Sequence, residues 1–247
     1  MASSFITFVL KIVVVWVSLI TINVSPAITL TEEAKALLDW KASGLYFPES
    51  WNANDTSPSK WKGITCNTAG RLTMLDLSHS VIYAELNRLN FSSFQFLVRL
   101  DLSWNDGDYY GIWGTIPDNI GMLSKLTHLY LSYNRITGSI PREIGNLKNL
   151  NHLDLFHNMI NGSIPREIEN LKNLNQLDFF HNNLTGSIPQ EIVNLKYLNQ
   201  LDLSHNMING SIPPEIGNLK NLNQLDLSHN RINGSIPPEI GKPQKSQ

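Results

Sequence analysis

A unit of 24 residues returns along the second half of the chain and limits its fold more than any other feature. The regular copies begin at Leu126, Leu150, Leu174, Leu198 and Leu222. Two less regular copies begin at Leu72 and Leu97, and the second is 29 residues long because it carries an insertion within DGDYYGIW, after Asn105. A period of this size is typical of solenoids, in which each unit buries its apolar side only against its neighbours. We therefore expect seven stacked units, the last one incomplete.

Each unit opens with the pattern L-x-x-L-x-L-x-x-N. Its leucines do not share one helical face, whereas the alternation at its last positions matches a short strand with one buried face. Gly138 and Pro141, with their equivalents, then favour an irregular segment, because Gly allows positive φ or close approach and Pro cannot extend a strand ladder. Two further apolar columns are expected in the core: Ile136, Ile160, Leu184, Ile208 and Ile232, and Ile140, Ile164, Ile188, Ile212 and Ile236.

An asparagine occupies the last position of that pattern in six units: Asn105, Asn134, Asn158, Asn182, Asn206 and Asn230. A side-chain amide there can pair with backbone groups where the chain leaves the strand, and can also reach the neighbouring turn. Buried backbone groups left unpaired would cost about 1–3 kcal/mol each. We therefore expect a structural asparagine ladder, with Ser80 in this place in the atypical first unit.

The N-terminal segment is predicted to be a targeting signal. Residues 5–22 are apolar apart from one lysine, and the uninterrupted part has the length of a signal-peptide core. Ser25 and Ala27 supply small residues before a cleavage site. The alternative is an uncleaved anchor helix. The expected divisions are a signal peptide over 1–27, a cap over 28–71, repeats over 72–241 and a tail over 242–247.

Two motifs resemble a known family. The segment TGSIPREIGNLKNL resembles the plant-specific class of leucine-rich repeats, with its hallmark L-x-G-x-I-P. EAKALLDWKASG, followed by SWN and WKGITC, resembles the N-terminal cap of plant receptor-like kinases and receptor-like proteins. The resemblance implies an α/β solenoid, a right-handed curved superhelix with a parallel concave sheet, an irregular or 3-10 convex side and a helical cap. It also implies an ectodomain that binds peptides, receptors or cell-wall proteins outside the cell.

The cap can be placed more closely. Thr29 and Glu32 have the spacing of a capping box, and Gly44 is a natural helix stop. One helical stripe is expected to contain Ala34, Leu37, Leu38 and Lys41. The family cap holds two cysteines, but here only Cys66 is present, with Ser59 or a neighbour in place of the first.

The C-terminal end also departs from the family pattern. GKPQKSQ follows Ile240, where other copies continue with NLKNL. An uncapped solenoid exposes its last leucine layer. No transmembrane or kinase segment follows, so we interpret the chain as a shortened relative of a receptor or a fragment of one.

Several concave positions break the repeat consensus. Aromatic residues and arginine are favoured anchors of binding surfaces, and they replace Asp, Ser or His in units two to five. The candidate binding residues are Arg99, Trp104, Tyr130, Tyr133, Phe156, His157, Phe180 and His181. Tyr109, Tyr110 and Trp113 of the insertion are expected beside them. The alternative is that these aromatics only pack on one another along the sheet.

All seven histidines lie in two concave columns, and His157, His181, His205 and His229 share one of them. Histidines in a flat ladder cannot easily surround a metal ion in a tetrahedral arrangement, so a metal site is not favoured. Histidine titrates near pH 6.5, and the plant cell wall is mildly acidic, so a pH effect on partner affinity is the more interesting hypothesis.

Composition and motifs exclude several classes. A net charge of −2 argues against a nucleic-acid binder. No enzyme motif occurs. The concave aspartates are better explained as a structural position repeated in each unit than as paired catalytic acids, so no enzyme and no cofactor are expected.

Two sets of surface positions remain. Convex glutamate and lysine columns, including Lys148, Lys172, Lys196 and Lys220, are interpreted as a solvated face. Glycosylation sequons occur at Asn54, Asn90, Asn161, Asn183, Asn209 and Asn233.

The leading hypothesis is an extracellular protein or peptide recognition module that acts in cell-surface signalling or defence with a partner receptor kinase. It would reach the membrane only through that partner or an uncleaved anchor. The alternatives are a secreted inhibitor of cell-wall-degrading enzymes, similar to polygalacturonase-inhibiting proteins, and a truncated receptor-kinase gene product.

Overall fold

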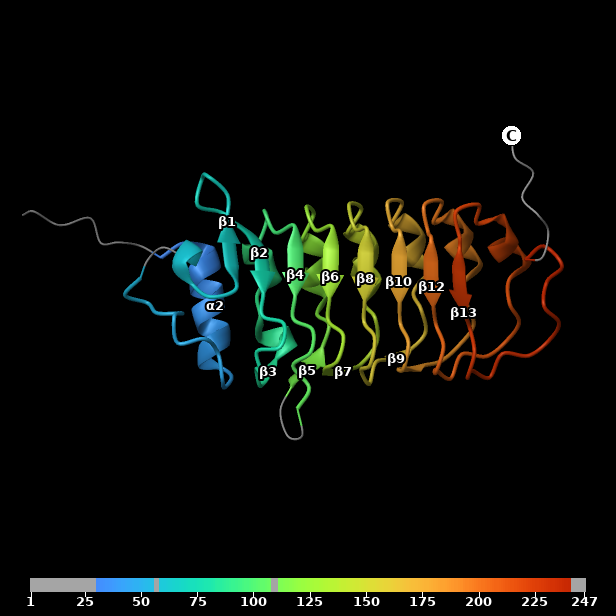
Figure 1. The fold of residues 1–247 in the computed structure, drawn as a ribbon, viewed down its shortest axis with the longest axis horizontal. Helices are drawn as coiled ribbons and strands as arrows, with labels where there is room; N and C mark the ends of the chain where they lie inside the picture. Colours follow the sequence, from blue (N-terminus) through green and yellow to red (C-terminus); the bar gives the residue numbers. More distant parts are fainter. Residues whose placement is uncertain (1–29, 56–57, 108–110, 241–247) are drawn as a thin grey trace, which may run out of the picture.

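The computed structural model describes residues 30–55, 58–107 and 111–240, which form one elongated solenoid (Figure 1). Within these ranges, the concave side is a sheet of seven parallel strands, one per unit, and one antiparallel strand pairs with the first of them. The strands are β1 (Ile64–Cys66), β2 (Leu72–Asp76), β4 (Arg99–Asp101), β6 (His128–Tyr130), β8 (His152–Asp154), β10 (Gln176–Asp178), β12 (Gln200–Asp202) and β13 (Gln224–Asp226). Equivalent leucines pair across the sheet, as Leu129 and Leu153 do. The expected solenoid is confirmed.

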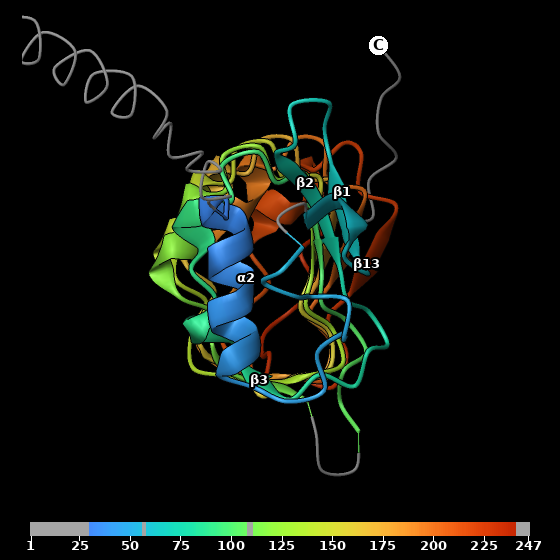
Figure 2. The same ribbon diagram turned by 90° about the vertical axis from the view of Figure 1, so that its left-hand side faces the viewer.

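Short 3-10 helices lie behind this sheet and form the convex side (Figure 2). In the regular units they follow a proline such as Pro141, which has a restricted φ and no N–H to pair. Their third residue, such as Ile144, is buried against the core. The convex helices span Leu86–Arg88, Phe91–Ser93, Asp118–Met122, Arg142–Asn146, Arg166–Asn170, Gln190–Asn194 and Pro214–Asn218, and one further 3-10 helix, Pro58–Lys60, lies in the cap.

Two small sheets connect the concave and convex sides, and the sequence did not predict them. One contains β3 (Ala84–Glu85), β5 (Ile112–Thr115) and β7 (Arg135–Thr137), and the other contains β9 (Asn161–Gly162) and β11 (Asn183–Leu184). Gly138 follows β7 with φ 73°. A Cβ atom there would lie 2.8 Å from the Thr115 side chain of the neighbouring coil. The glycine column therefore meets both needs, positive φ and close approach.

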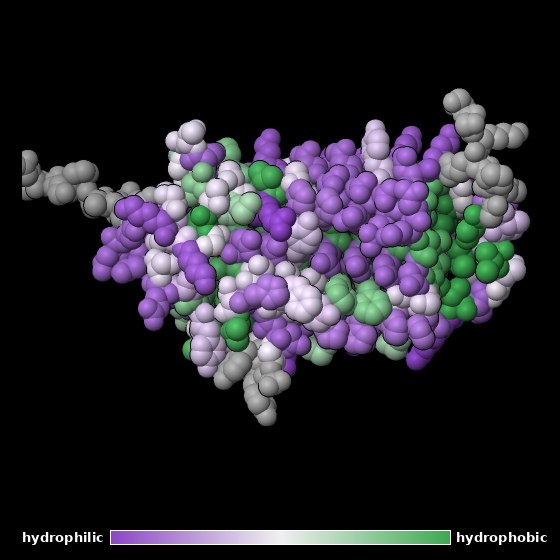
Figure 3. All heavy atoms as spheres, in the orientation of Figure 1, coloured by the Kyte–Doolittle hydropathy of each residue, from purple (hydrophilic) through white to green (hydrophobic). Residues whose placement is uncertain are grey.

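The apolar columns form a continuous core through the middle units but not at the C-terminal end. Leu129 and Leu177 are fully buried. By contrast, Ile236 is 74% exposed, and Ile212 and Ile232 are only partly buried. Ile212 and Ile232 still pack against the core, but the prediction that both columns lie in the core is wrong for Ile236, because no described coil packs over the last one. Figure 3 shows apolar atoms gathered at this end of the molecule.

Helix α2 (Glu32–Ala42) closes the N-terminal end of the stack (Figure 2). It begins after Thr31, whose hydroxyl accepts a hydrogen bond from the backbone N of Ala34 at 3.1 Å. The expected capping box of Thr29 and Glu32 is therefore wrong, because Thr31 is the N-cap and Glu32 is already the first helical residue. Thr29 itself lies outside the described residues.

The buried face of α2 differs from the expected stripe. Ala34 and Leu37 are fully buried, but Leu38 and Lys41 are only partly buried, and Trp40 takes their place in the core. The Trp40 ring begins a cluster with centroid distances of 4.8, 5.5 and 5.8 Å along Trp40, Phe47, Trp51 and Trp61. These rings have the high apolar area that a cap needs to cover the first coil.

Gly44 directly follows the end of helix α2, where a helix stop is expected, and it also makes a close contact. Helix α2 ends at Ala42 with Ser43 as its C-cap in a right-handed conformation. A Cβ atom on Gly44 would lie 2.7 Å from the carbonyl oxygen of Tyr83. This position therefore requires glycine for close contact between the cap and the first coil.

The predicted signal peptide, residues 1–27, lies outside the described residues. Among the helices between residues 30 and 240 that the structure describes, none combines the length and hydropathy of a transmembrane span.

Cys66 on β1 is partly buried and forms no disulfide. Burial raises the pKa of its thiol, and the nearby charge of Glu33 raises it further. Because the thiolate is the reactive form, we expect Cys66 in the folded chain to react with iodoacetamide at pH 7.5 several-fold more slowly than in the guanidinium-unfolded chain. Mass spectrometry over time measures both rates. Equal rates would contradict the buried environment.

Candidate functional site

The asparagine ladder fixes the point where each coil leaves the concave sheet. Asn182 Oδ1 accepts a hydrogen bond from the backbone N of Ile160 at 3.0 Å. Its Nδ2 donates to the carbonyl oxygens of Leu155 (2.9 Å) and Phe179 (3.3 Å), so that one side chain joins two coils. Equivalent bonds to both coils are made by Asn105, Asn134, Asn158, Asn206 and Asn230. The hydroxyl of Ser80 donates only within its own coil.

The residue before each ladder position has a left-handed backbone, with φ between 50° and 58°. These residues are His79, Trp104, Tyr133, His157, His181, His205 and His229. Histidine enters this region several-fold more often than most residues with a side chain. The backbone therefore gives a reason for histidine in this column that is independent of any ligand, whereas Trp104 and Tyr133 have no such reason.

Four aromatic side chains run along the concave sheet as a continuous strip, which we call the aromatic strip: Trp104, Tyr133, Phe156 and Phe180. Trp104 stacks on Tyr133 with ring centroids 3.6 Å apart, and Tyr133 meets Phe156 edge-on at 4.6 Å. Phe156 lies 4.9 Å from Phe180. Trp104 remains 46% exposed, and the other three are partly exposed. The aromatics therefore pack on one another and still present an apolar surface.

The histidines continue this strip toward the C-terminal units. The rings of His157 and His181 stack at 4.5 Å, and those of His205 and His229 stack at 4.0 Å. Phe180 contacts His205 at 4.9 Å, which joins the two groups. Over the described part of the chain, no three His, Cys, Asp or Glu side chains are arranged to hold a metal ion.

Arg99 and Tyr130 lie beside the strip but are already paired with each other. The Arg99 guanidinium lies 4.6 Å over the Tyr130 ring and 2.8 Å from Asp101 Oδ2. His128 and His152 stack next to them at 4.6 Å. Burial, and then the charge of Arg99, lowers the pKa of His128. The pKa of His152 is lowered by burial and by the charges of His128 and Arg99, so this environment favours the neutral form of both rings.

Phe180 changes the environment of one aspartate, Asp178. In the next unit, Asp202 accepts hydrogen bonds from the hydroxyl (2.6 Å) and backbone N (2.9 Å) of Ser204. Phe180 replaces that serine for Asp178, which accepts only the backbone N of Phe180 at 3.0 Å. Burial therefore raises the pKa of Asp178 to about 6, with a contribution from the charges of Asp154 and Asp202.

This shift predicts a pH-dependent effect of Asp178→Asn. The folded chain binds the Asp178 proton more tightly than the unfolded chain, so wild-type stability from this group falls as pH rises from about 4 through about 6. The variant has no such loss and is expected to melt a few degrees above wild type at pH 7.5, an advantage that disappears at pH 4. Thermal melts from pH 4 to 8 measure the difference. Asp202→Asn is the matched control, and a pH-independent difference for Asp178→Asn would contradict the assignment.

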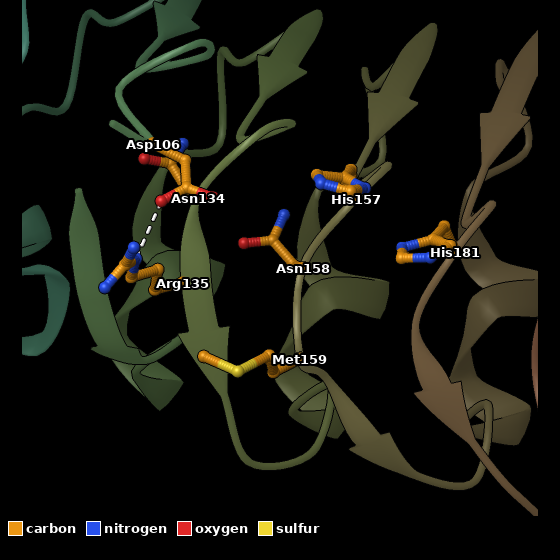
Figure 4. A pocket seen from close by; sticks show the side chains of 7 residues that line it. All are labelled: Asp106, Asn134, Arg135, His157, Asn158, Met159 and His181. Atoms are coloured by element: carbon orange, nitrogen blue, oxygen red, sulfur yellow. Dashed lines mark hydrogen bonds and ion pairs between the residues drawn. The ribbon is translucent and has the colours of Figure 1, made fainter. Parts of the chain in front are cut away.

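The inserted segment begins beside the strip at a shallow pocket of about 310 Å³. Arg135 and Asp106 form an ion pair at one end (2.7 Å), and His157 and His181 line the other, with Met159 below them (Figure 4). Arg135 also donates to the carbonyl oxygen of residue 107 at 3.0 Å. The pocket thus offers a guanidinium, two imidazoles and a thioether next to the aromatic strip.

The aromatic residues of the insertion do not join the strip in the part that the structure describes. Tyr109 and Tyr110 lie outside the described residues. Trp113 lies on β5 in the small sheet, with its ring 6.4 Å from that of Tyr83. Trp113, expected beside the aromatic residues of the concave side, lies on the small sheet instead, because the chain has already turned away from the concave sheet.

The six sequon asparagines are all exposed. They are Asn54, Asn90, Asn161, Asn183, Asn209 and Asn233. Asn161 and Asn183 lie on β9 and β11, in the small sheet, so sugars there would leave the concave surface open.

Comparison with known proteins shows that the chain is similar to leucine-rich repeat proteins. A family model described as a leucine-rich repeat region matches residues 77–210. Models of a leucine rich repeat N-terminal domain and of a leucine rich repeat match residues 30–67 and 221–243. The LRR receptor-like serine/threonine-protein kinase RGI3 of Arabidopsis thaliana is 37% identical over 105 residues, which cover 41% of this chain and 9% of that protein.

Solved structures of plant receptors are similar as well. The crystal structure of PEPR1 with AtPEP1 aligns with a TM-score of 0.78 and 32% identity over 85% of this chain and 30% of that chain. The peptide hormone receptor RGFR1 in complex with RGF2 aligns with a TM-score of 0.56 and 42% identity over 60% of this chain and 23% of that chain. The chain thus spans about a tenth of the curated relatives it matches and less than a third of these two solved chains.

Proposed function

Because the chain belongs to the leucine-rich repeat family and resembles plant receptor ectodomains, we propose that it recognises a peptide or a protein through the aromatic strip. The strip is a self-supporting apolar surface on a rigid sheet. Rigid, partly exposed aromatic side chains supply large contact areas at little entropic cost on binding. The pocket of Arg135, His157 and His181 beside it offers polar contacts that would fix the orientation of a ligand.

One observation carries this proposal: the strip departs from the repeat's own consensus. Ser occupies the Phe156 and Phe180 positions in five other units, and His occupies the Trp104 and Tyr133 positions in five others. The serines bond the aspartate of their strand, and histidine suits the left-handed backbone, so framework alone favours those residues. In four adjacent units an aromatic residue replaces the serine or histidine that the framework favours. The four aromatic side chains form one surface.

The proposed setting is the outside of a plant cell, where the chain works with a partner receptor kinase and reaches the membrane through it or through an N-terminal anchor. The division into cap (28–71), repeats (72–241) and tail (242–247) belongs to the same proposal, as do the eight candidate contact residues. No catalytic role is assigned to the six concave aspartates, since four of them accept hydrogen bonds from the serine two residues later in their own coil.

The test uses a variant that returns the strip to consensus, W104H/Y133H/F156S/F180S. Wild type and variant are immobilised at equal density and exposed separately to synthetic AtPEP1, to RGF2, to a fungal polygalacturonase and to plant apoplastic fluid. We expect wild type to retain a peptide or receptor ectodomain that the variant does not. The same retained set on both would contradict the proposal, and retention of a fungal polygalacturonase alone would favour an inhibitor instead.

A further inference from the structure

A row of lysines lies on a different edge of the solenoid, away from the aromatic strip. Lys148, Lys172, Lys196 and Lys220 occupy equivalent positions, in the turn that leads from each 3-10 helix to the next strand. We call this row the lysine edge. These turns line the upper edge of the molecule in Figure 1, and Figure 3 shows hydrophilic atoms gathered along that edge.

The lysine charges are not used by the fold. All four side chains are exposed, and none makes an ion pair within the described residues. The arginines of the same convex side behave differently, since Arg142 and Arg166 pair with Glu143 (2.9 Å) and Glu167 (3.4 Å). Four unpaired ammonium groups in a row therefore leave a positive line on a chain whose net charge is −2.

The spacing of this line is held by a second set of side-chain amides. Asn173 Nδ2 donates to the carbonyl oxygen of Lys148 at 2.9 Å, and Asn221 Nδ2 donates to that of Lys196 at 2.7 Å. Each of these bonds joins one coil to the preceding coil. Its asparagine lies three residues before the strand of its own coil. Successive lysines are thus about one strand spacing apart, roughly 5 Å.

Tyr197 interrupts the asparagines that follow the lysines. Asn149, Asn173 and Asn221 occupy its place in neighbouring units. The Tyr197 side chain is 60% exposed and stacks on no other ring among the residues that the structure describes. It lies in a hollow of about 550 Å³ whose other lining residues are Val193, Asn194, Lys196, Asn218, Lys220 and Asn221. A flat ring is thus bordered by amides and by two ammonium groups.

We propose that the lysine edge binds a linear acidic polysaccharide of the uronate class. Such a polymer carries one carboxylate on every sugar ring, a repeat of the same order as the coil spacing. The carboxylates pair with successive lysines, the C–H face of one ring stacks on Tyr197, and the amides bond its hydroxyls. The site is separate from the aromatic strip, so the two can be occupied together.

The probe is sodium polygalacturonate, tested by affinity electrophoresis and titration calorimetry at low ionic strength. K172Q/K196Q/K220Q is expected to weaken binding at least about tenfold, because each pair lost is electrostatic, and salt is expected to weaken wild-type binding steeply. Y197N, which restores the repeat consensus, is expected to weaken it about threefold without changing the salt dependence. K35Q/K60Q/K62Q removes three exposed lysines of the cap and is the charge-matched control.

Several results would overturn the assignment. Equal loss in the control triple variant would show a general charge effect. Equal affinity for heparin or double-stranded DNA, with the same lysine dependence, would show a nonspecific polyanion surface. Full binding of a completely methyl-esterified polymer would exclude pairing with carboxylates. Peptide or protein binding by the aromatic strip is measured separately and does not depend on these outcomes.

Discussion

Replacing Asn182 with Ala is expected to lower the free energy of unfolding by about 3 kcal/mol or more, because each buried backbone group left unpaired costs about 1–3 kcal/mol. The variant loses the acceptor for the Ile160 N–H and the donor to the carbonyl oxygens of Leu155 and Phe179. Neither solvent nor another side chain can replace these bonds without opening the stack, since Asn182 is only 7% exposed. Urea unfolding followed by circular dichroism measures the loss.

Asn175→Ala is the matched control for this prediction. Asn175 belongs to the same repeat unit, but its side chain lies near the surface and donates one hydrogen bond, to the Tyr197 carbonyl oxygen at 3.2 Å. Water can take over that bond, so a loss below about 1 kcal/mol is expected. Equal losses in the two variants would mean that the ladder amides do not hold the coils together.

The double variant F156S/F180S is expected to weaken binding of the retained peptide or receptor at least about 30-fold, the size expected when central aromatic anchors are removed. The fold should persist, because serine occupies this place in other units and bonds the aspartate of its strand. Serine at position 180 also gives Asp178 a hydroxyl partner, so the melting temperature at pH 7.5 is expected to be unchanged or higher. Calorimetric titration and thermal melts of the same samples measure the two quantities.

Met122→Ala provides the comparison for this loss. Met122 is 54% exposed at the end of a 3-10 helix on the convex side, so the variant also removes exposed apolar area. Its affinity should match wild type. If F156S/F180S binds as tightly as Met122→Ala, the two phenylalanines are packing residues of the sheet and the ligand contacts lie elsewhere.

The spacing of the leucines was enough to predict the strands and their register. A residue such as Leu177 can be buried only if its coil stacks on Leu153 and Leu201, and the pairing of β10 with β8 and β12 follows from that requirement. The asparagine column could likewise be connected with the turns, because its position directly follows the alternating segment.

Other features depend on three-dimensional packing that no single spacing reveals. The positive φ of His157 and its equivalents follows from the turn geometry of stacked coils. The raised pKa of Asp178 depends on which neighbour faces its carboxylate. The cap helix begins directly after Thr31, whose hydroxyl caps it, and local preference alone could not choose this threonine over Thr29, because both residue types are the same.

Photo-crosslinking from the concave sheet tests the central claim most directly. The variants Phe156→benzoylphenylalanine and Met122→benzoylphenylalanine place the same reactive group on the aromatic strip and on the convex side. After irradiation with the retained ligand, we expect a covalent peptide or protein adduct at position 156 and none at position 122, as mapped by mass spectrometry. An adduct at position 122 with none at position 156 would contradict recognition by the aromatic strip.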